Sequence, residues 1–204
     1  SYRVRGRAAF GGEIREDATV EGGRLRWSSV ADQGDEPAAE GVLHVPLQST
    51  PVFWGQMLRV LVARPDLRAP TPGGAQLQAE RLQRIELDGA DGPTAVALYA
   101  VTGADAEPWY LWLRDDAERT FFGVAWPGFA VTPAGHEGAA ARLVEAMQQA
   151  SVDRLRRLQQ NAAQPLPGLT LIRDVRWFDA QAAVLRGPSD VYLPDGRIGA
   201  ITAP

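Results

Sequence analysis

The sequence contains no cysteine and no lysine, and only two of its 204 residues are histidine. Without cysteine there is no disulfide, no thiolate nucleophile and no cysteine-ligated zinc. The 21 basic residues are all arginine. Because alanine, glycine and proline are also abundant, we attribute this bias to a GC-rich coding sequence rather than to a special need for bidentate anion binding.

Long apolar runs and excess positive charge are also missing. No run of about 18 apolar residues is present, so no membrane-spanning helix is expected. The formal net charge is -4 and the pI is about 5.3, which argues against nucleic acid and against an anionic membrane surface as partners. Apolar residues make up 45% and charged residues 23% of the chain, as is typical of a folded globular protein with one large or two small domains.

Alternating apolar and polar residues, separated by turn signals, predict an α+β fold that is mainly antiparallel β. Gly22-Gly23 predicts a hairpin turn. From residue 76 to residue 132 the strand signals recur at the spacing of a meander sheet. The other expectations for the first half are a strand over 2–10, a polar loop over 33–40, a short strand over 41–46 and a loop over 69–74.

Two helices are predicted. Thr50 followed by Pro51 is typical of a helix start, and predicts a short helix over 51–63. A long amphipathic helix is predicted over 138–162, where it is expected to pack across the sheet. Its apolar stripe steps by three or four residues through Val144, Met147, Ser151, Leu155, Leu158 and Ala162.

Residues 161–168 predict a linker, because Pro165 and Pro167 prevent the helix from continuing. We therefore divide the chain into a domain over 1–165 and a second segment over 166–204. In the second segment, strands are expected over 169–178 and 190–193. Asp195-Gly196 then predicts a type I′ turn leading into a strand over 197–201.

This last segment resembles the opening of amidohydrolase-superfamily enzymes. These commonly begin with a strand punctuated by Asp or Asn, here LIRDVRWFD over 171–179, followed by a strand that ends in D-G-[RK]-I-x-x-I, here DVYLPDGRIGAI over 190–201. Pro194 departs from the pattern, since an acidic residue is frequent there. The resemblance covers about 36 residues, and the ordered pair of strands is more specific than either alone.

The resemblance implies that 166–204 is the first hairpin of a composite β-sandwich built from both ends of a longer polypeptide. That sandwich flanks a metal-dependent β/α barrel that hydrolyses amide-like C–N bonds with a divalent metal, expected to be zinc. The metal ligands are expected to begin with a His-x-His pair beyond Pro204. No catalytic, cofactor-binding or metal-ligating residue can therefore be carried over to this chain, and residues 1–165 are interpreted as an accessory, non-catalytic β-rich domain.

Partners and location follow from the same resemblance. The expected partner is the rest of the same polypeptide, and a homo-oligomer is left open. Upstream segments, including Trp112-Leu113 and Gly135-His136-Glu137, resemble those of exported bacterial amidohydrolases. The chain also starts inside a strand without an initiator Met, so we expect a removed signal peptide and a periplasmic or secreted bacterial protein, with a cytoplasmic location as the alternative.

The residues that could carry chemistry favour structural roles. His44 is expected in a strand, and His136 at a helix start; His136-Glu137 does not complete H-E-x-x-H, because Ala140 occupies the position of the second histidine. Five acids could be interpreted as paired carboxylates for acid–base chemistry, but they are expected in hairpin loops, where solvated carboxylates are common: Asp105, Glu107, Asp115, Asp116 and Glu118.

One aromatic group leaves an alternative function open. Alternation places Tyr110 and Trp112 on one face of a strand and Trp109, Leu111 and Leu113 on the other. The structural interpretation is that the long helix covers one face and the barrel or another strand covers the other. In the alternative, the Tyr110 and Trp112 face belongs to a binding module that holds an apolar ligand or a partner in a groove between sheet and helix.

Overall fold

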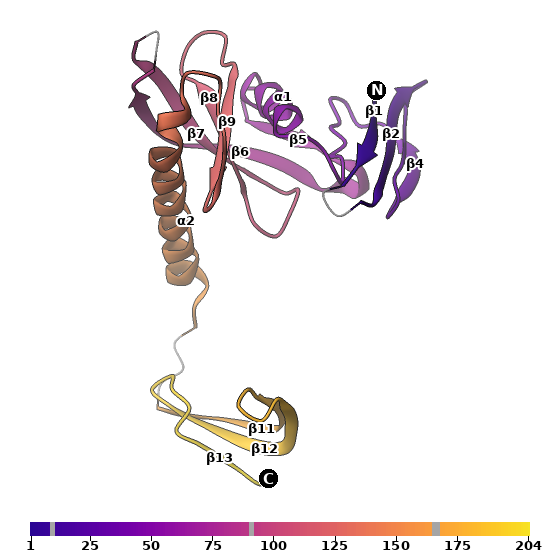
Figure 1. Cartoon of the computed structure of the whole chain (residues 1–204). Coiled ribbons are helices and arrows are strands. Elements are labelled where there is room, and N and C mark those ends of the chain that lie inside the picture. Colours follow the sequence, from indigo (N-terminus) through magenta and orange to yellow (C-terminus); the bar gives the residue numbers. More distant parts are fainter. Residues whose placement is uncertain (9–10, 90–91, 165–167) are drawn as a thin grey trace. The chain divides into compact units, whose positions relative to one another are not determined.

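The computed structural model describes residues 1–8, 11–89, 92–164 and 168–204 (Figure 1). The chain divides into two compact units, Ser1–Asp153 and Arg154–Pro204. The fold is α+β with mainly antiparallel sheets, as predicted. No helix in the described part of the chain is long and apolar enough to cross a membrane.

The first sheet is a four-stranded antiparallel meander. The order is β1 to β4, and the strands are β1 (Tyr2–Arg7), β2 (Glu13–Glu21), β3 (Arg24–Ser28) and β4 (Gln33–Pro37). Gly22 and Gly23 connect β2 to β3 with φ of 56° and 74°, which is the positive-φ pair that a type I′ turn requires. The hairpin predicted at these glycines is confirmed.

Two expectations for this region are wrong. The polar stretch over 33–40 contains β4, an edge strand whose Asp35 bonds to Arg24 and Arg26 of β3. An exposed edge strand needs no apolar face, so its polarity misled the prediction. Residues 42–46 belong to no strand. Their apolar side chains, Leu43 and Val45, instead pack beside the core under α1.

The second sheet is a six-stranded antiparallel meander in the order β10-β9-β8-β7-β6-β5. It confirms the meander predicted over 76–132. The loop predicted over 69–74 is partly wrong, because Arg68–Pro70 pairs with β6 as a short edge strand. The strands are β5 (Arg68–Pro70), β6 (Gln76–Leu87), β7 (Thr94–Thr102), β8 (Trp109–Arg114), β9 (Phe121–Trp126) and β10 (Phe129–Val131).

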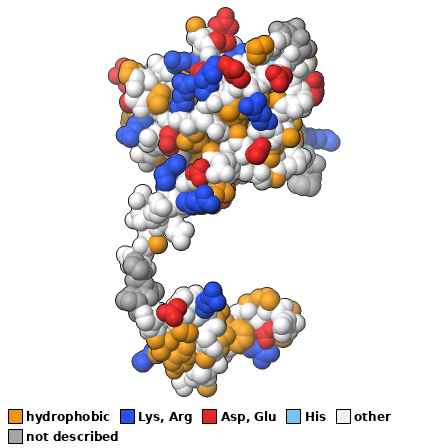
Figure 2. All heavy atoms as spheres, turned by 90° about the vertical axis from the view of Figure 1, so that its left-hand side faces the viewer, with side chains coloured by type: hydrophobic (Ala, Val, Ile, Leu, Met, Phe, Trp, Pro, Cys, Tyr) orange, Lys and Arg blue, Asp and Glu red, His pale blue; other side chains and the backbone are white. Residues whose placement is uncertain are grey.

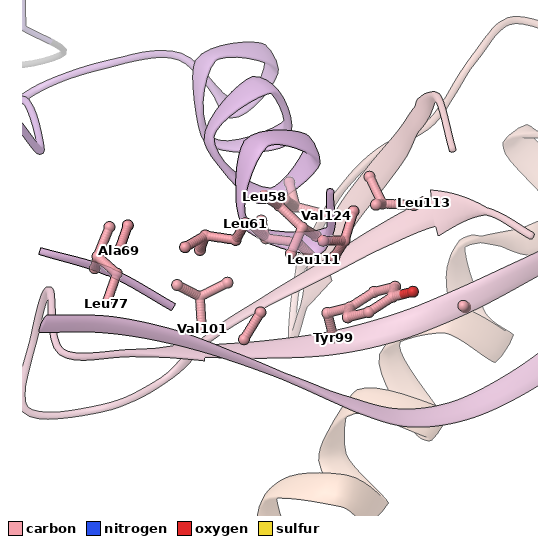
Figure 3. Packing of buried hydrophobic residues seen from close by; sticks show 12 residues of the cluster. Leu58, Leu61, Ala69, Leu77, Tyr99, Val101, Leu111, Leu113 and Val124 are labelled. Atoms are coloured by element: carbon pink, nitrogen blue, oxygen red, sulfur yellow. The ribbon is translucent and has the colours of Figure 1, made fainter. Parts of the chain in front are cut away.

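Helix α1 (Pro51–Val62) covers one face of this sheet, and its range agrees with the predicted helix. Thr50 precedes it in extended conformation, although its side chain makes no capping bond. Figure 3 shows Leu58 of α1 beside Val124 and Leu111, and Leu61 on the side of Val101. The helix can approach β9 closely because Gly55 has no side chain: a Cβ there would lie 2.3 Å from the Phe121 ring.

Helix α2 (Ala140–Ala162), preceded by a short 3₁₀ turn (Glu137–Ala139), covers the opposite face. Met147 is buried and Val144 packs against the same core cluster, which confirms the predicted packing for the first half of the helix. Leu143, which is outside the predicted stripe, is buried as well. Leu155 and Leu158 are exposed, so the predicted stripe is wrong in its second half. The 23 residues of α2 span about 35 Å at 1.5 Å per residue, whereas the six residues of β8 span only about 20 Å.

The second unit contains a three-stranded antiparallel sheet in the order β11-β12-β13. The strands are β11 (Leu169–Asp179), β12 (Val184–Pro194) and β13 (Ala200–Thr202). β12 is longer than the strand predicted over 190–193, because its first half pairs with the end of β11. The predicted turn is confirmed: Asp195 and Gly196 have φ of 49° and 73°, and the Arg197 N–H donates to the Pro194 carbonyl at 3.0 Å. The strand predicted over 197–201 is partly wrong, because pairing with β12 begins only at Ala200.

This small sheet has almost no core of its own. Among its described residues only Val191 is a buried apolar side chain, and Figure 2 shows hydrophobic side chains spread over its surface. The large apolar side chains that it exposes are Leu169, Ile172, Phe178, Val184, Leu185, Ile198 and Ile201. The linker predicted over 161–168 is wrong at its start, because α2 continues to Ala162. Residues 165–167 lie outside the described residues, and the 1–165 and 166–204 division stays a prediction.

The close approach of α1 to β9 can be tested with Gly55→Ala. The added methyl would meet the Phe121 ring, and we expect a loss of about 1–3 kcal/mol in the free energy of unfolding from overpacking, despite the better helix propensity of alanine. Gly138→Ala is the matched control, because a Cβ there meets nothing within 4 Å. Urea unfolding measures both variants; equal stability of the two would contradict the packing described.

Candidate functional site

The first candidate site is an apolar cavity of about 410 Å³ where β8 and β9 separate. The two strands pair at Leu111 with Val124 and at Trp112 with Gly123, but the register does not continue to Tyr110 or Trp109. The β8–β9 seam, meaning the line along which these two strands pair, therefore opens at this end. Side chains from both strands line the space between them.

Both helices contribute to the walls of this cavity. Trp54 of α1 lies beside Trp109, with ring centroids 5.5 Å apart, and Met147 and Ser151 of α2 close another side. Tyr110 lines the same space. The polar groups among these are few, so the cavity suits a small molecule with a mainly apolar body.

Tyr110 and Trp112, which were predicted to form an apolar ligand face, have different surroundings in the structure. Tyr110 and Trp112 do share the α2 face of the sheet, while Leu111 and Leu113 face α1. Only Tyr110 lines the cavity. Trp112 is fully buried in the core, and its Nε1 has no hydrogen-bond partner in the described structure. The second face is covered by α1, an element not considered for this role in the sequence interpretation.

The second candidate site contains a buried carboxylate. Glu16 of β2 is only 2% exposed. It accepts hydrogen bonds from the Tyr2 hydroxyl at 3.0 Å, the Leu47 N–H at 2.9 Å and, more weakly, the Gln48 N–H at 3.4 Å. All three donors are neutral. Among the described residues, the carboxylate therefore has no cationic hydrogen-bond partner, an arrangement that burial makes costly.

His44 contacts the Tyr2 hydroxyl and so joins the Tyr2–Glu16 pair. The Tyr2 hydroxyl lies 2.5 Å from Nδ1 of His44. Since an ionised carboxylate can only accept, Tyr2 satisfies both contacts by donating to Glu16 and accepting from an Nδ1–H of His44. This tautomer leaves Nε2 of His44 as an acceptor. His44 is thus a half-buried loop residue rather than the strand residue predicted from the sequence.

Burial shifts the pKa values of both partners in directions that keep them uncharged. Burial raises the pKa of the Tyr2 phenol, and the nearby Glu16 charge adds to the effect. Burial lowers the pKa of His44, against the opposing attraction of Glu16 and Asp32. At neutral pH the site therefore holds a neutral phenol and a neutral imidazole.

The combination of Tyr2, Glu16 and His44 was missed in the sequence interpretation. One signal was present: Glu16 occupies the same alternation phase of β2 as Ile14 and Ala18, which are inward positions. A charged residue in the buried phase of a strand needs partners. The sequence does not reveal that those partners, Tyr2, Leu47 and Gln48, come from 14, 31 and 32 positions away.

His136 has the structural role predicted for it. It precedes the 3₁₀ turn at Glu137–Ala139, its ring is buried against Phe122, and its Nε2 lies 3.2 Å from the Thr94 hydroxyl. Its Nδ1 has no partner in the part of the chain that the structure describes.

The hairpin-loop acids are not brought together into one site. Asp115 binds Arg81 and Arg84, and Asp116 accepts from backbone N–H groups of its own loop. Glu107 lines the apolar cavity. Asp105 lines a different cavity, beside His44. Within the described residues no group of three or more His, Asp or Glu side chains is placed to hold a metal ion.

The acids that carry the amidohydrolase resemblance build the β11–β12 hairpin. Asp179 accepts from the N–H groups of Gln181 and Ala182 and from Arg186, and the Ala182 and Arg186 bonds lower its pKa. Asp190 accepts from the N–H of Asp174, where β11 is irregular and φ is 53°. These hydrogen bonds give both of these acids of the motif a local structural role.

Comparisons with known protein families, with curated proteins and with solved structures find no match for this chain. The resemblance to amidohydrolases therefore rests on the motif in the last segment and stays a prediction.

The lowered pKa of His44 predicts a pH effect on stability. As the pH falls below about 6.5, the ordinary value for histidine, the unfolded chain binds a proton at His44 before the folded chain does. The free energy of unfolding should therefore fall between about pH 6.5 and pH 5, a range in which ordinary carboxylates stay ionised.

His44→Gln should flatten this pH dependence, which urea unfolding at each pH measures. Because His136 is present in both proteins, the difference between them reports His44. An unchanged slope in the variant would show that His44 titrates normally in the folded state.

Proposed function

We propose that this chain is the non-catalytic N-terminal part of a metal-dependent amidohydrolase. In this proposal, β11 to β13 form one part of a composite β-sandwich, and residues 1–165 form an accessory domain. The observation that carries the proposal is the sheet of the second unit, in which one apolar side chain is buried and seven large ones are exposed.

A sheet of this kind requires a cover. Each apolar side chain removed from water contributes about 1.5–3 kcal/mol, and a three-stranded sheet with one buried apolar residue forgoes nearly all of that stabilisation. β11 and β13 are also edge strands, which can pair with further strands. Strands from the other end of a longer polypeptide, as in the family that the motif resembles, would satisfy both needs.

The proposed chemistry belongs to the barrel. There, one or two divalent ions, expected to be zinc, lower the pKa of a bound water and polarise the scissile carbonyl. In this proposal the chain contributes folding surface, and the metal ligands belong to the barrel. We further propose a bacterial protein exported to the periplasm or secreted, with the accessory domain shielding an interface, shaping access to the barrel or supporting assembly, including assembly as a homo-oligomer.

Hydrogen exchange tests the missing cover. In the chain alone, amides on the outer edges of β11 and β13 should exchange far faster than those of β7, which is central in its sheet. In a polypeptide that continues through the barrel, the same amides should become protected, and the protein should bind stoichiometric zinc that the chain alone does not. Full protection of β11 and β13 in a monomer of this chain would refute the proposal.

A second function is favoured by the apolar cavity between β8 and β9. Its size of about 410 Å³ falls within the range of small-molecule sites, and Trp54, Trp109 and Tyr110 provide aromatic walls. In this alternative the domain is a binding module for a small apolar ligand. A partner protein is less well accommodated, since the space is bounded by both helices.

Titration with a neutral apolar fluorophore, N-phenyl-1-naphthylamine, tests the alternative. Binding should be saturable and should weaken at least tenfold in Ser151→Phe, which fills the cavity from α2. Gln148→Phe is the control, because Gln148 is exposed on the same helix and does not line the cavity. Non-saturable binding, or equal binding by the two variants, would exclude this function.

A further inference from the structure

A second cavity, of about 240 Å³, lies between the first sheet, the extended segment over 42–47 and the loop before β8. Its volume corresponds to about eight water molecules at 30 Å³ each. It is lined by acidic and aromatic side chains, and the ones that matter here are Glu16, Trp27, Asp32, His44, Asp105 and Trp109.

The charged side chains among the described residues that line this cavity are all acidic. Glu16, Asp32 and Asp105 are acidic, and no arginine is among the described residues that line the cavity. The hydrogen bonds that these acids make come from neutral groups: the partners of Glu16 given above, the Trp27 indole N–H for Asp32 at 2.8 Å, and the Ala106 N–H for Asp105 at 2.7 Å. Their negative charge is therefore not neutralised inside the cavity, which favours a cation.

The aromatic walls favour an organic cation over a metal ion. Indole rings attract ammonium groups through their π faces, and Trp27 and Trp109 both line the space. Trp27 is held in place, because it lies across the strand pair from Gly34, where a Cβ would come within 2.2 Å of its ring. The ring of His44 packs beside it, with centroids 5.6 Å apart.

His44 adds a hydrogen-bond acceptor. Its Nδ1 is engaged by Tyr2, so the bare nitrogen of the neutral ring is Nε2, which has no hydrogen-bond partner in the described structure. A ligand that carries N–H donors can bind this nitrogen, whereas a cation without N–H groups cannot.

We propose that this cavity binds the ammonium group of a small primary amine. The carboxylates supply the attraction, the two indoles form the walls, and Nε2 of His44 accepts one N–H. This site is independent of the amidohydrolase proposal, because it lies within the first unit and its binding is measured on this chain alone.

Titrations of the isotopically labelled chain test the proposal, with the Trp27 indole N–H signal as the readout. The probes are n-butylammonium, the neutral 1-butanol and tetramethylammonium, which is a cation without N–H groups. We expect saturable shifts with n-butylammonium, binding at least tenfold weaker for 1-butanol and clearly weaker for tetramethylammonium. Equal binding of n-butylammonium and 1-butanol, or no saturable binding, would overturn the proposal.

A charge-matched pair of variants locates the site. Asp32→Asn with Asp105→Asn should weaken n-butylammonium binding at least tenfold, whereas Glu21→Gln with Glu118→Gln removes the same charge outside the cavity and should leave binding within twofold. Equal weakening in both pairs would show a general effect of net charge and refute the site. All four positions are exposed, so the fold is not at risk.

His44→Phe tests the acceptor. It keeps an aromatic ring and removes Nε2, so the preference for n-butylammonium over tetramethylammonium should disappear. An unchanged preference would assign the N–H contact elsewhere and overturn the proposed role of His44.

Trp109→Leu removes one of the two indole rings that line the cavity. The binding of both cations, n-butylammonium and tetramethylammonium, should become weaker. Unaltered binding would contradict the aromatic wall.

Discussion

The strand at the centre of the larger sheet is buried on both faces, and the rest of the first unit is arranged around that requirement. Val96 and Leu98 of β7 point to the α2 side, and Ala97 and Tyr99 point to the α1 side. A sheet with two apolar faces is stable only when both are covered. The two helices meet this need, and Gly55 lets α1 come close enough to do so. The same two helices enclose the apolar cavity, since Trp54 of α1 and Met147 and Ser151 of α2 line it.

Trp109 connects the two cavities of the first unit, because it lines the apolar one beside Trp54 and the acidic one beside Trp27. Trp109 is half-buried and lies at the end of β8 where pairing with β9 has stopped. An amine with an apolar body would find complementary surfaces on either side of this indole. The acidic cavity owes its chemistry to a buried carboxylate that is solvated by a phenol and backbone N–H groups instead of a cation, so its charge remains available to a ligand.

The sheet of the second unit lacks the apolar covering that the larger sheet has on both faces. Its strands are well paired and its turns are built by Asp179 and Asp195, yet its apolar side chains have almost nothing to pack against. Local sequence is sufficient for hairpins, because turn geometry and strand pairing act over a few residues. It is not sufficient for burial, which requires a second layer. The amidohydrolase proposal supplies that layer from further polypeptide, and it explains why this motif carries structural acids and no reactive ones.

The sequence by itself determined the α+β class, the meander, both helices, the two glycine-containing turns and the faces of β8, because these depend on periodicity and on residues that tolerate positive φ. It was wrong at β4 and at residues 42–46, where an edge strand needs no apolar pattern and where an apolar stretch packs as a loop. It also predicted an apolar stripe along the whole of α2, whereas Leu155 and Leu158 in the second half are exposed. Only the tertiary structure joined Tyr2, Glu16 and His44, opened the seam between β8 and β9, and buried Trp112 while leaving Tyr110 at a cavity. Those features depend on contacts between segments far apart in the chain, for which local periodicity carries no signal.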